Sequence, residues 1–149
     1  MEFKSSLRWD YRQNARNEDL QIAVMKAICG MLNSQGGILL VGVQDDGTVI
    51  GIERDLKTLQ KQSADGFELL LTDLVKNYLG LEHRNRVHVD FAREGGRQVC
   101  VIAIERSPAP VFLHIGGRDE FWVRMGNSTR QLDAKAALHY IQAHWSDAG

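Results

Sequence analysis

The sequence predicts an α+β fold in one domain, with a mixed, largely antiparallel sheet covered by about three helices. Short apolar runs separated by Gly-rich turns predict strands joined as antiparallel hairpins. Three other stretches place apolar residues three and four positions apart, which is the spacing of an amphipathic helix. Because 149 residues can bury one core and no linker or repeat interrupts them, we expect a single domain over residues 1–149.

The first half of the chain is expected to form a β-α-β-β unit. The segment "EFKSSL" (2–7) alternates like an edge strand, and Asn17 can cap a helix that ends near residue 32. Most of that helix should be buried. The strand "ILLVGV" (38–43) is apolar on both faces, so we expect it in the centre of the sheet, where the first strand can pair with it in parallel. Asp46 and Gly47 then predict a turn into "TVIGI" (48–52).

The second half adds two helices and four strands. A helix over 67–78 is ended by Gly80, and strands follow over 87–92 and 98–105, the latter central. "VFLH" and "EFWVRM" flank a Gly-Gly turn and predict a further hairpin, after which Asp133 can cap the last helix.

Composition excludes several classes of protein. Charged residues make up 25% of the chain, and no apolar run approaches the roughly 20 residues of a membrane span, so we expect a cytoplasmic protein without a membrane partner. The net charge of −1 excludes a bulk polycation, although local basic patches remain open. Cys29 and Cys100 lie in apolar segments and are expected to be buried thiols. The glycines at 36–37 precede a strand, which is the wrong order for a dinucleotide fingerprint.

An acidic group is the first candidate site. If the first strand lies beside strand 38–43, carboxylates of Glu2, Asp45 and Asp46 could converge at one end of the sheet, near Lys4, and bind a divalent cation. The alternative is that Asp45 and Asp46 only make the turn and Glu2 is a solvated charge. Spacing alone favours this alternative.

The segment "FWVRMGNSTRQL" (121–132) is the second candidate site. Its guanidinium, amide and hydroxyl groups are typical phosphate ligands, contributed by Arg124, Asn127, Ser128, Thr129 and Arg130. The alternative is that this loop only caps the next element. A basic N-terminal strip, formed by Lys4, Arg8, Arg12 and Arg16, offers further phosphate contacts.

Three segments resemble the Schlafen-type AlbA-like domain in their order along the chain. They are "EFKSS", "MLNSQGGILLVGVQDDGTVIGI" and "FWVRMGNSTRQL", and the resemblance extends from residue 2 to about 132. It implies an α+β fold, binding of DNA or RNA without a cofactor, and a role in transcriptional regulation. The leading prediction is therefore a nucleic-acid-binding module.

The resemblance also implies an alternative activity, because some animal relatives resemble metal-dependent endoribonucleases with two glutamates and an aspartate. The second glutamate falls on Glu2 and the aspartate on Asp45, and Mg²⁺ or Mn²⁺ would be the cofactor. The first glutamate has no counterpart, since only Met1 precedes Glu2, and we expect a fragment that lacks its N-terminal edge. A third alternative is a protein-interaction domain or homodimer that uses "VFLH" and Trp122.

Overall fold

The computed structural model describes residues 1–146 and contains a four-stranded mixed sheet. Its strands are β1 (Glu2–Lys4), β4 (Gly37–Val41), β6 (Arg97–Ile104) and β5 (Val87–Glu94), in that spatial order. β1 pairs with β4 in parallel, whereas the β4–β6 and β6–β5 pairs are antiparallel. The predicted mixed sheet, the parallel first pair and the central position of both apolar strands are confirmed.

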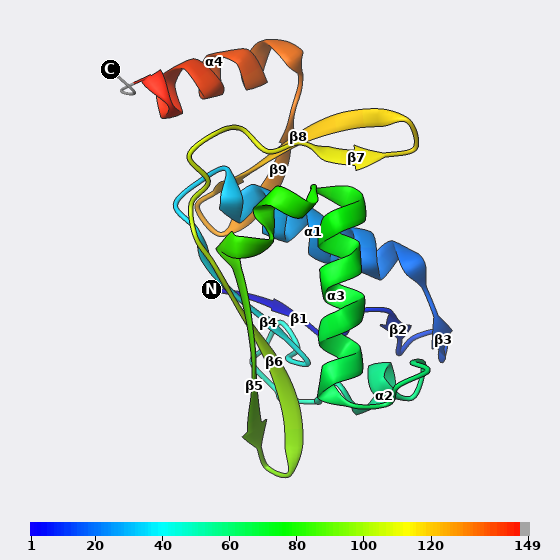
Figure 1. Ribbon diagram of the computed structural model, residues 1–149. Helices are drawn as coiled ribbons and strands as arrows, with labels where there is room; N and C mark the ends of the chain where they lie inside the picture. Colours follow the sequence, from blue (N-terminus) through cyan, green and yellow to red (C-terminus); the bar gives the residue numbers. More distant parts are fainter. Residues whose placement is uncertain (147–149) are drawn as a thin grey trace.

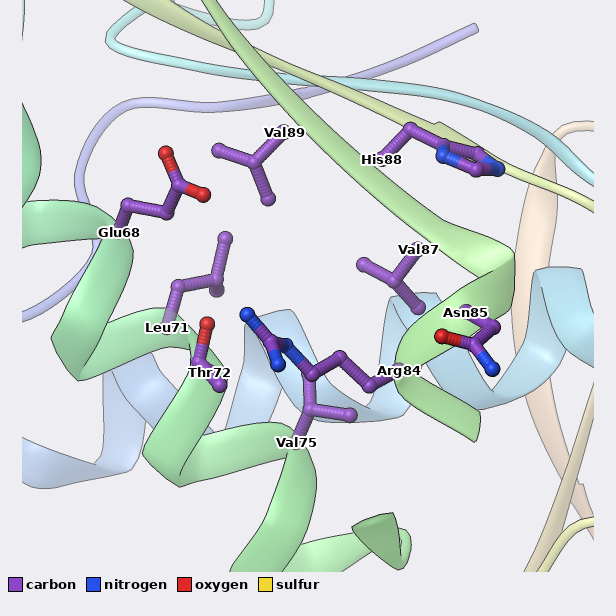
Figure 2. Close-up of a pocket in the computed structure, with 9 residues that line it drawn as sticks. All are labelled: Glu68, Leu71, Thr72, Val75, Arg84, Asn85, Val87, His88 and Val89. Carbon is purple, nitrogen blue, oxygen red and sulfur yellow. The ribbon is translucent and has the colours of Figure 1, made fainter. Parts of the chain in front are cut away.

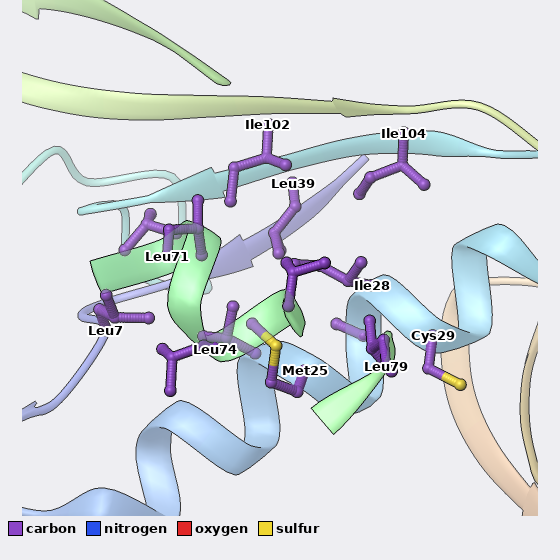
Figure 3. Packing of buried hydrophobic residues seen from close by; sticks show 14 of the residues in the cluster. Leu7, Met25, Ile28, Cys29, Leu39, Leu71, Leu74, Leu79, Ile102 and Ile104 are labelled. Atoms are coloured by element: carbon purple, nitrogen blue, oxygen red, sulfur yellow. The ribbon is translucent and has the colours of Figure 1, made fainter. Parts of the chain in front are cut away.

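Two long helices cover one face of this sheet (Figure 1). In α1 (Glu18–Leu32) the side chain of Asn17 accepts the N–H of Asp19, as predicted, and in α3 (Ala64–Tyr78) Ser63 accepts the N–H of Gly66. Figure 3 shows the core between these helices and the sheet, where buried side chains of both helices and of the sheet interdigitate. Its labelled members include Met25, Ile28, Leu39, Leu71 and Ile102.

A second, three-stranded sheet lies on the other side of α1. It consists of β7 (Leu113–Ile115), β8 (Arg118–Met125) and β9 (Ser128–Leu132), and α4 (Ala134–His144) packs on it (Figure 1). Because α1 lies between the two sheets, nine of its residues are buried, which confirms the expected burial. A Cβ added to Gly30 would lie 3.2 Å from the backbone of Val123, so α1 and β8 approach each other closely.

Several short elements were not predicted. β2 (Trp9–Asp10) and β3 (Ala15–Arg16) form a small hairpin, while α2 (Glu53–Leu56) and the 3-10 helix η1 (Leu81–Arg86) precede α3 and β5. The predicted α+β class in one domain holds, but the strands form three sheets. The described part of the chain contains three long helices, as expected, together with the two short ones.

The predicted strand over 48–52 does not form. Only the Val43–Val49 bridge continues the turn, and the N–H groups of Ile50 and Gly51 both donate to the carbonyl of Gly42 at 2.9 Å. Gly42 and Gly51 have φ angles of +102° and +81°, which bend the chain out of strand geometry.

The central strand β4 is apolar on both faces, but only one of these faces is covered. Ile38 is 39% exposed and Leu40 is half-buried, because the helices cover only the face formed by Leu39 and Val41. Within residues 1–146, no helix is both long enough and apolar enough to cross a membrane.

Candidate nucleic-acid interface

The carboxylate of Glu2 is the centre of a polar cluster between β1, β8 and β9. It accepts a hydrogen bond from Nη1 of Arg124 and another, at 3.3 Å, from Oγ1 of Thr129, while Nζ of Lys4 lies 3.4 Å from its second oxygen. The side chains of Arg124 and Glu2 are only 12% and 16% exposed. This placement argues against the predicted phosphate contacts of Arg124 and Thr129, because both side chains already donate to Glu2, and the same carboxylate forms an ion pair with the more exposed Lys4.

Asn33 and Ser34 fix the same strand from the end of α1. The Asn33 amide is fully buried and donates to the carbonyls of Val111 and Trp122, both at 2.8 Å, while its oxygen accepts the N–H of Val111. Oγ of Ser34 accepts the N–H of Arg124 at 2.9 Å. The segments that carry the family resemblance thus contact one another and form a structural clamp, a role that the sequence analysis did not assign to them.

The tip of the β8–β9 hairpin is exposed. Gly126 and Asn127 form the turn, and Oγ of Ser128 donates to the carbonyl of Met125 at 3.2 Å. Nε of Arg130 donates to Oγ of Ser128 at 3.3 Å, and no carboxylate within residues 1–146 pairs with this guanidinium. Of the predicted phosphate contacts in this segment, Asn127 and Arg130 remain available at the surface.

The side chain of Arg8 is buried and contacts Thr58. Its guanidinium donates to Oγ1 and the carbonyl oxygen of Thr58 at 2.8 and 2.7 Å, and the residue is only 9% exposed. The buried carboxylate of Asp55 accepts the N–H groups of three successive residues, Leu7, Arg8 and Trp9. Burial raises the pKa of Asp55, and these three bonds act in the opposite direction. The placement argues against the predicted phosphate contact of Arg8.

The β2–β3 hairpin presents a basic and aromatic surface, which we call the Arg12/Arg16 surface and which also includes Tyr11, Trp9 and Arg54. The guanidinium of Arg54 lies 4.7 Å from the centroid of the Trp9 ring and donates to Oδ1 of Asn14 at 2.8 Å. Tyr11 is 44% exposed. The guanidinium groups of Arg12 and Arg16 are exposed and make no hydrogen bond or ion pair with the described residues, so their charges are available to a ligand.

Asp10 is the acidic neighbour of this surface. Oδ1 accepts the N–H groups of Arg12 and Gln13, and Oδ2 accepts the amide of Asn17. These bonds, the Asn17 bond first, lower the pKa of Asp10. The carboxylate therefore organises the hairpin turn, and it attracts the Arg12 guanidinium electrostatically without forming an ion pair with Arg12 or Arg16.

Asp45 lies in a different place from Glu2. It lines a cavity of about 490 Å³ with Ser5, Tyr11 and Arg12, beyond the end of β4, whereas Glu2 pairs with Leu39 within the sheet. The side chain of Asp46 accepts the N–H of Thr48 at 2.9 Å, which lowers its pKa and confirms its predicted turn role.

The described residues contain no group of three or more His, Cys, Asp or Glu side chains that could hold a metal ion. Glu2, Asp45 and Asp46 are therefore not brought together, and they do not fit a shared Mg²⁺ or Mn²⁺ ion. The endoribonuclease alternative stays a prediction, and residues 1–146 supply no cluster of three ligands for its metal ion.

A second groove, of about 450 Å³, lies between α3 and β5 (Figure 2). Leu71, Val75, Val87 and Val89 form its apolar floor, and Arg84 of η1 reaches across it. The sequence analysis missed this groove. The only signals were the alternation of β5 and the apolar face of α3, and these patterns describe a packed core equally well.

Comparisons with known proteins agree with this fold. The sequence model of a family described as "Schlafen, AlbA_2" matches residues 1–133. No protein of curated function matches the chain.

Two solved structures share the architecture. The DIP2311 protein of Corynebacterium diphtheriae has a TM-score of 0.64 and 22% identity over 96% of this chain, which spans 27% of the length of that protein chain. The N-terminal domain of a protein from Nitrosomonas europaea, described as related to the ATP-dependent DNA helicase RecG, has a TM-score of 0.51 and 17% identity. That comparison covers 89% of this chain and 83% of the other.

Proposed function

Because this chain belongs to the Schlafen AlbA_2 family, we propose that it is a nucleic-acid-binding module that contacts phosphates through the Arg12/Arg16 surface. The observation that carries the proposal is the pair of exposed, unpaired guanidinium groups beside an exposed tyrosine. Arginine binds phosphate oxygens in any sequence context, and aromatic rings stack on unpaired bases. The RecG-related protein, described as a DNA helicase, supports the same class of partner.

Arg130 and Asn127 offer a second contact in this proposal. The Arg12/Arg16 surface precedes the start of α1, whereas the β8–β9 hairpin contacts the last third of that helix at Gly30. Fifteen residues of helix span about 22 Å, which corresponds to roughly six nucleotides at about 3.4 Å each. One nucleic-acid strand can therefore reach both contacts.

The test is a titration of wild type and the double variant Arg12→Ala/Arg16→Ala. Labelled duplex DNA, the corresponding single strand and an RNA of the same sequence are used in parallel. We expect the double variant to bind at least about tenfold more weakly at low salt, and the slope of log K against log salt to become shallower by about two. Arg130→Ala should reduce that slope by about one.

The matched control is Lys76→Ala/Arg84→Ala, which removes the same charge from the far end of α3 and from η1. At about 0.15 M salt, where the Debye length is about 8 Å, it should leave affinity within about twofold of wild type, because the charges removed are remote from the proposed interface. Unchanged affinity of the Arg12→Ala/Arg16→Ala variant at low salt would reject the proposed interface. Equal losses in both double variants would show that only net charge matters.

A further inference from the structure

β5 is an unprotected edge strand of the four-stranded sheet. Among residues 1–146, its only neighbour in the sheet is β6. The N–H of Glu105 donates to the carbonyl of Arg86 at 2.9 Å, and backbone groups of successive residues point alternately toward β6 and away from it. The backbone N–H and C=O groups of residues 88, 90 and 92 therefore bond to β6, whereas those of residues 87, 89 and 91 face outward.

Most of the outward groups of β5 remain open. The N–H of Val87 donates to the carbonyl of Arg84, and the N–H of Phe91 donates to Oδ1 of Asp90. Both backbone groups of Val89 and the carbonyls of Val87 and Phe91 have no partner among the described residues. Such an edge can accept one more strand.

A groove with an apolar floor and a polar rim follows this open edge. Val87 and Val89 point toward Leu71 and Val75 of α3, and together these side chains form the floor of the 450 Å³ cavity (Figure 2). No proline or bulge interrupts the strand at these positions. A strand added here would place alternate side chains over the groove, since successive residues of a strand point to opposite faces.

The groove carries one unpaired charge of each sign. Arg84 extends from η1 across the groove toward Thr72 of α3, and Glu68 of α3 lies across from Val89, further along β5 (Figure 2). Neither side chain forms a hydrogen bond or ion pair within residues 1–146. An occupant of this groove therefore needs a carboxylate at the start of β5 and a cation further along.

These charges define the direction of the occupant. A strand that runs antiparallel to β5 has its C-terminal end at the start of β5, where Arg84 lies. Its earlier residues then pass Glu68. A carboxyl-terminal segment with two apolar residues at alternate positions, preceded by a lysine or arginine, complements every feature of the groove.

We propose that β5 and α3 bind an extended carboxyl-terminal peptide of a partner protein by strand addition. Val89 exchanges two backbone hydrogen bonds with the peptide, Arg84 binds its terminal carboxylate, and Glu68 binds its basic side chain. This site is separate from the Arg12/Arg16 surface and does not depend on nucleic-acid binding.

The probe is a fluorescein-labelled hexapeptide, Thr-Lys-Thr-Val-Thr-Val, with a free carboxylate. When the peptide runs antiparallel to β5, its two valines lie opposite Val87 and Val89, and its lysine lies opposite Phe91. We expect saturable binding by fluorescence anisotropy and slower hydrogen exchange of the Val89 amide. Arg84→Ala should weaken binding about tenfold, which corresponds to about 1.4 kcal/mol. Arg12→Ala removes the same charge at a remote surface and should leave the affinity for the peptide unchanged.

Two modified peptides test the geometry without altering the protein. N-methylation of the valine opposite Val89 removes a strand hydrogen bond and should abolish binding, whereas N-methylation of the next threonine, whose N–H faces away, should be tolerated. A C-terminal amide should weaken binding to wild type by about the same factor as Arg84→Ala and should not weaken it further in that variant.

Three results would overturn the proposal. One is the absence of saturation up to about 1 mM peptide, the weakest affinity that such contacts would give. Another is equal binding of the two N-methylated peptides. The third is a concentration-dependent dimer in sedimentation with the Val89 amide already protected, because a second copy of this chain would then occupy the edge.

Discussion

Arg124 illustrates how one residue type can serve two roles that sequence does not separate. In the segment "FWVRMGNSTRQL", an arginine beside small polar residues indicates phosphate binding as well as it indicates a cap. The deciding partner is Glu2, which is 122 positions away in the chain and binds the guanidinium. The same applies to Arg8, whose partner Thr58 is 50 positions away. Local sequence cannot reveal such pairs, because tertiary packing creates them.

The first prediction contrasts Arg124 with Arg130. Arg124→Ala should lower the free energy of unfolding by about 2 kcal/mol, since it leaves the mostly buried Glu2 carboxylate without its main partner. Arg130→Ala, at an exposed position of the neighbouring strand, should change it by less than about 0.5 kcal/mol. Urea denaturation followed by circular dichroism measures both values.

Glu2→Gln provides the control for this ion pair. If Arg124 acts on Glu2, the effects of the two substitutions will not add in the double variant, because each removes the same interaction. Additive effects would show that Arg124 stabilises the fold by other contacts.

The sequence predicted best the helices and strands whose stabilising residues lie within their own segment. α1 has an apolar face and begins at its predicted cap, Asn17, whereas α3 has the predicted apolar face but begins at Ala64, three residues before the predicted start, because the sequence analysis did not identify the Ser63 cap. β2 and β3 have two residues each and depend on Asp55, which is 45 positions beyond Asp10 and holds the preceding backbone through three bonds. No local sequence pattern predicts a hairpin that depends on a distant carboxylate. The sequence therefore predicted the Arg12/Arg16 surface only as a basic strip.

The second prediction concerns the contact between α1 and β8. Alanine normally stabilises a helix by about 1 kcal/mol relative to glycine. At Gly30 the added Cβ would lie 3.2 Å from the backbone of Val123 and 3.3 Å from the side chain of Thr129, and a strand in the middle of a sheet cannot easily shift. We therefore expect Gly30→Ala to destabilise the protein by about 1 kcal/mol or more.

Ala23→Gly, at a partly exposed position of the same helix, measures the propensity term separately in the same urea titrations. It should cost about 1 kcal/mol. A Gly30→Ala variant that is more stable than wild type would show that β8 moves away from the helix at little cost.

For the whole molecule, the sequence predicted the α+β class but not the division into three sheets. Hairpin signals identify which strands are neighbours in sequence, and they do not determine whether consecutive hairpins join one sheet. The position of α1 between two sheets settles this, because β8 and β9 pack on the helix and not beside β6. The same arrangement brings Asn33, Ser34, Arg124 and Glu2 together from distant segments.

The third prediction follows from the position of α1 between the two sheets. Cys29 and Cys100 are both fully buried free thiols, as expected, and burial raises the pKa of Cys29 to about 12 and raises that of Cys100 as well. The thiolate is the reactive form, so neither should react with a thiol reagent at neutral pH while the protein is folded. Sγ of Cys29 lies 3.5 Å from the carbonyl oxygen of Val111, on the side of α1 that faces the second sheet. Cys100 lies in β6 of the first sheet.

Both cysteines belong to one buried cluster, so we expect both to become reactive only through global unfolding. Labelling with iodoacetamide in mild urea, quantified for each cysteine by mass spectrometry, should then give the same opening free energy at both sites. Faster labelling of Cys29 would mean that the second sheet and α4 separate from α1 independently. In that case the clamp around Glu2 would open with them, and Arg124→Ala would accelerate labelling of Cys29 more than that of Cys100.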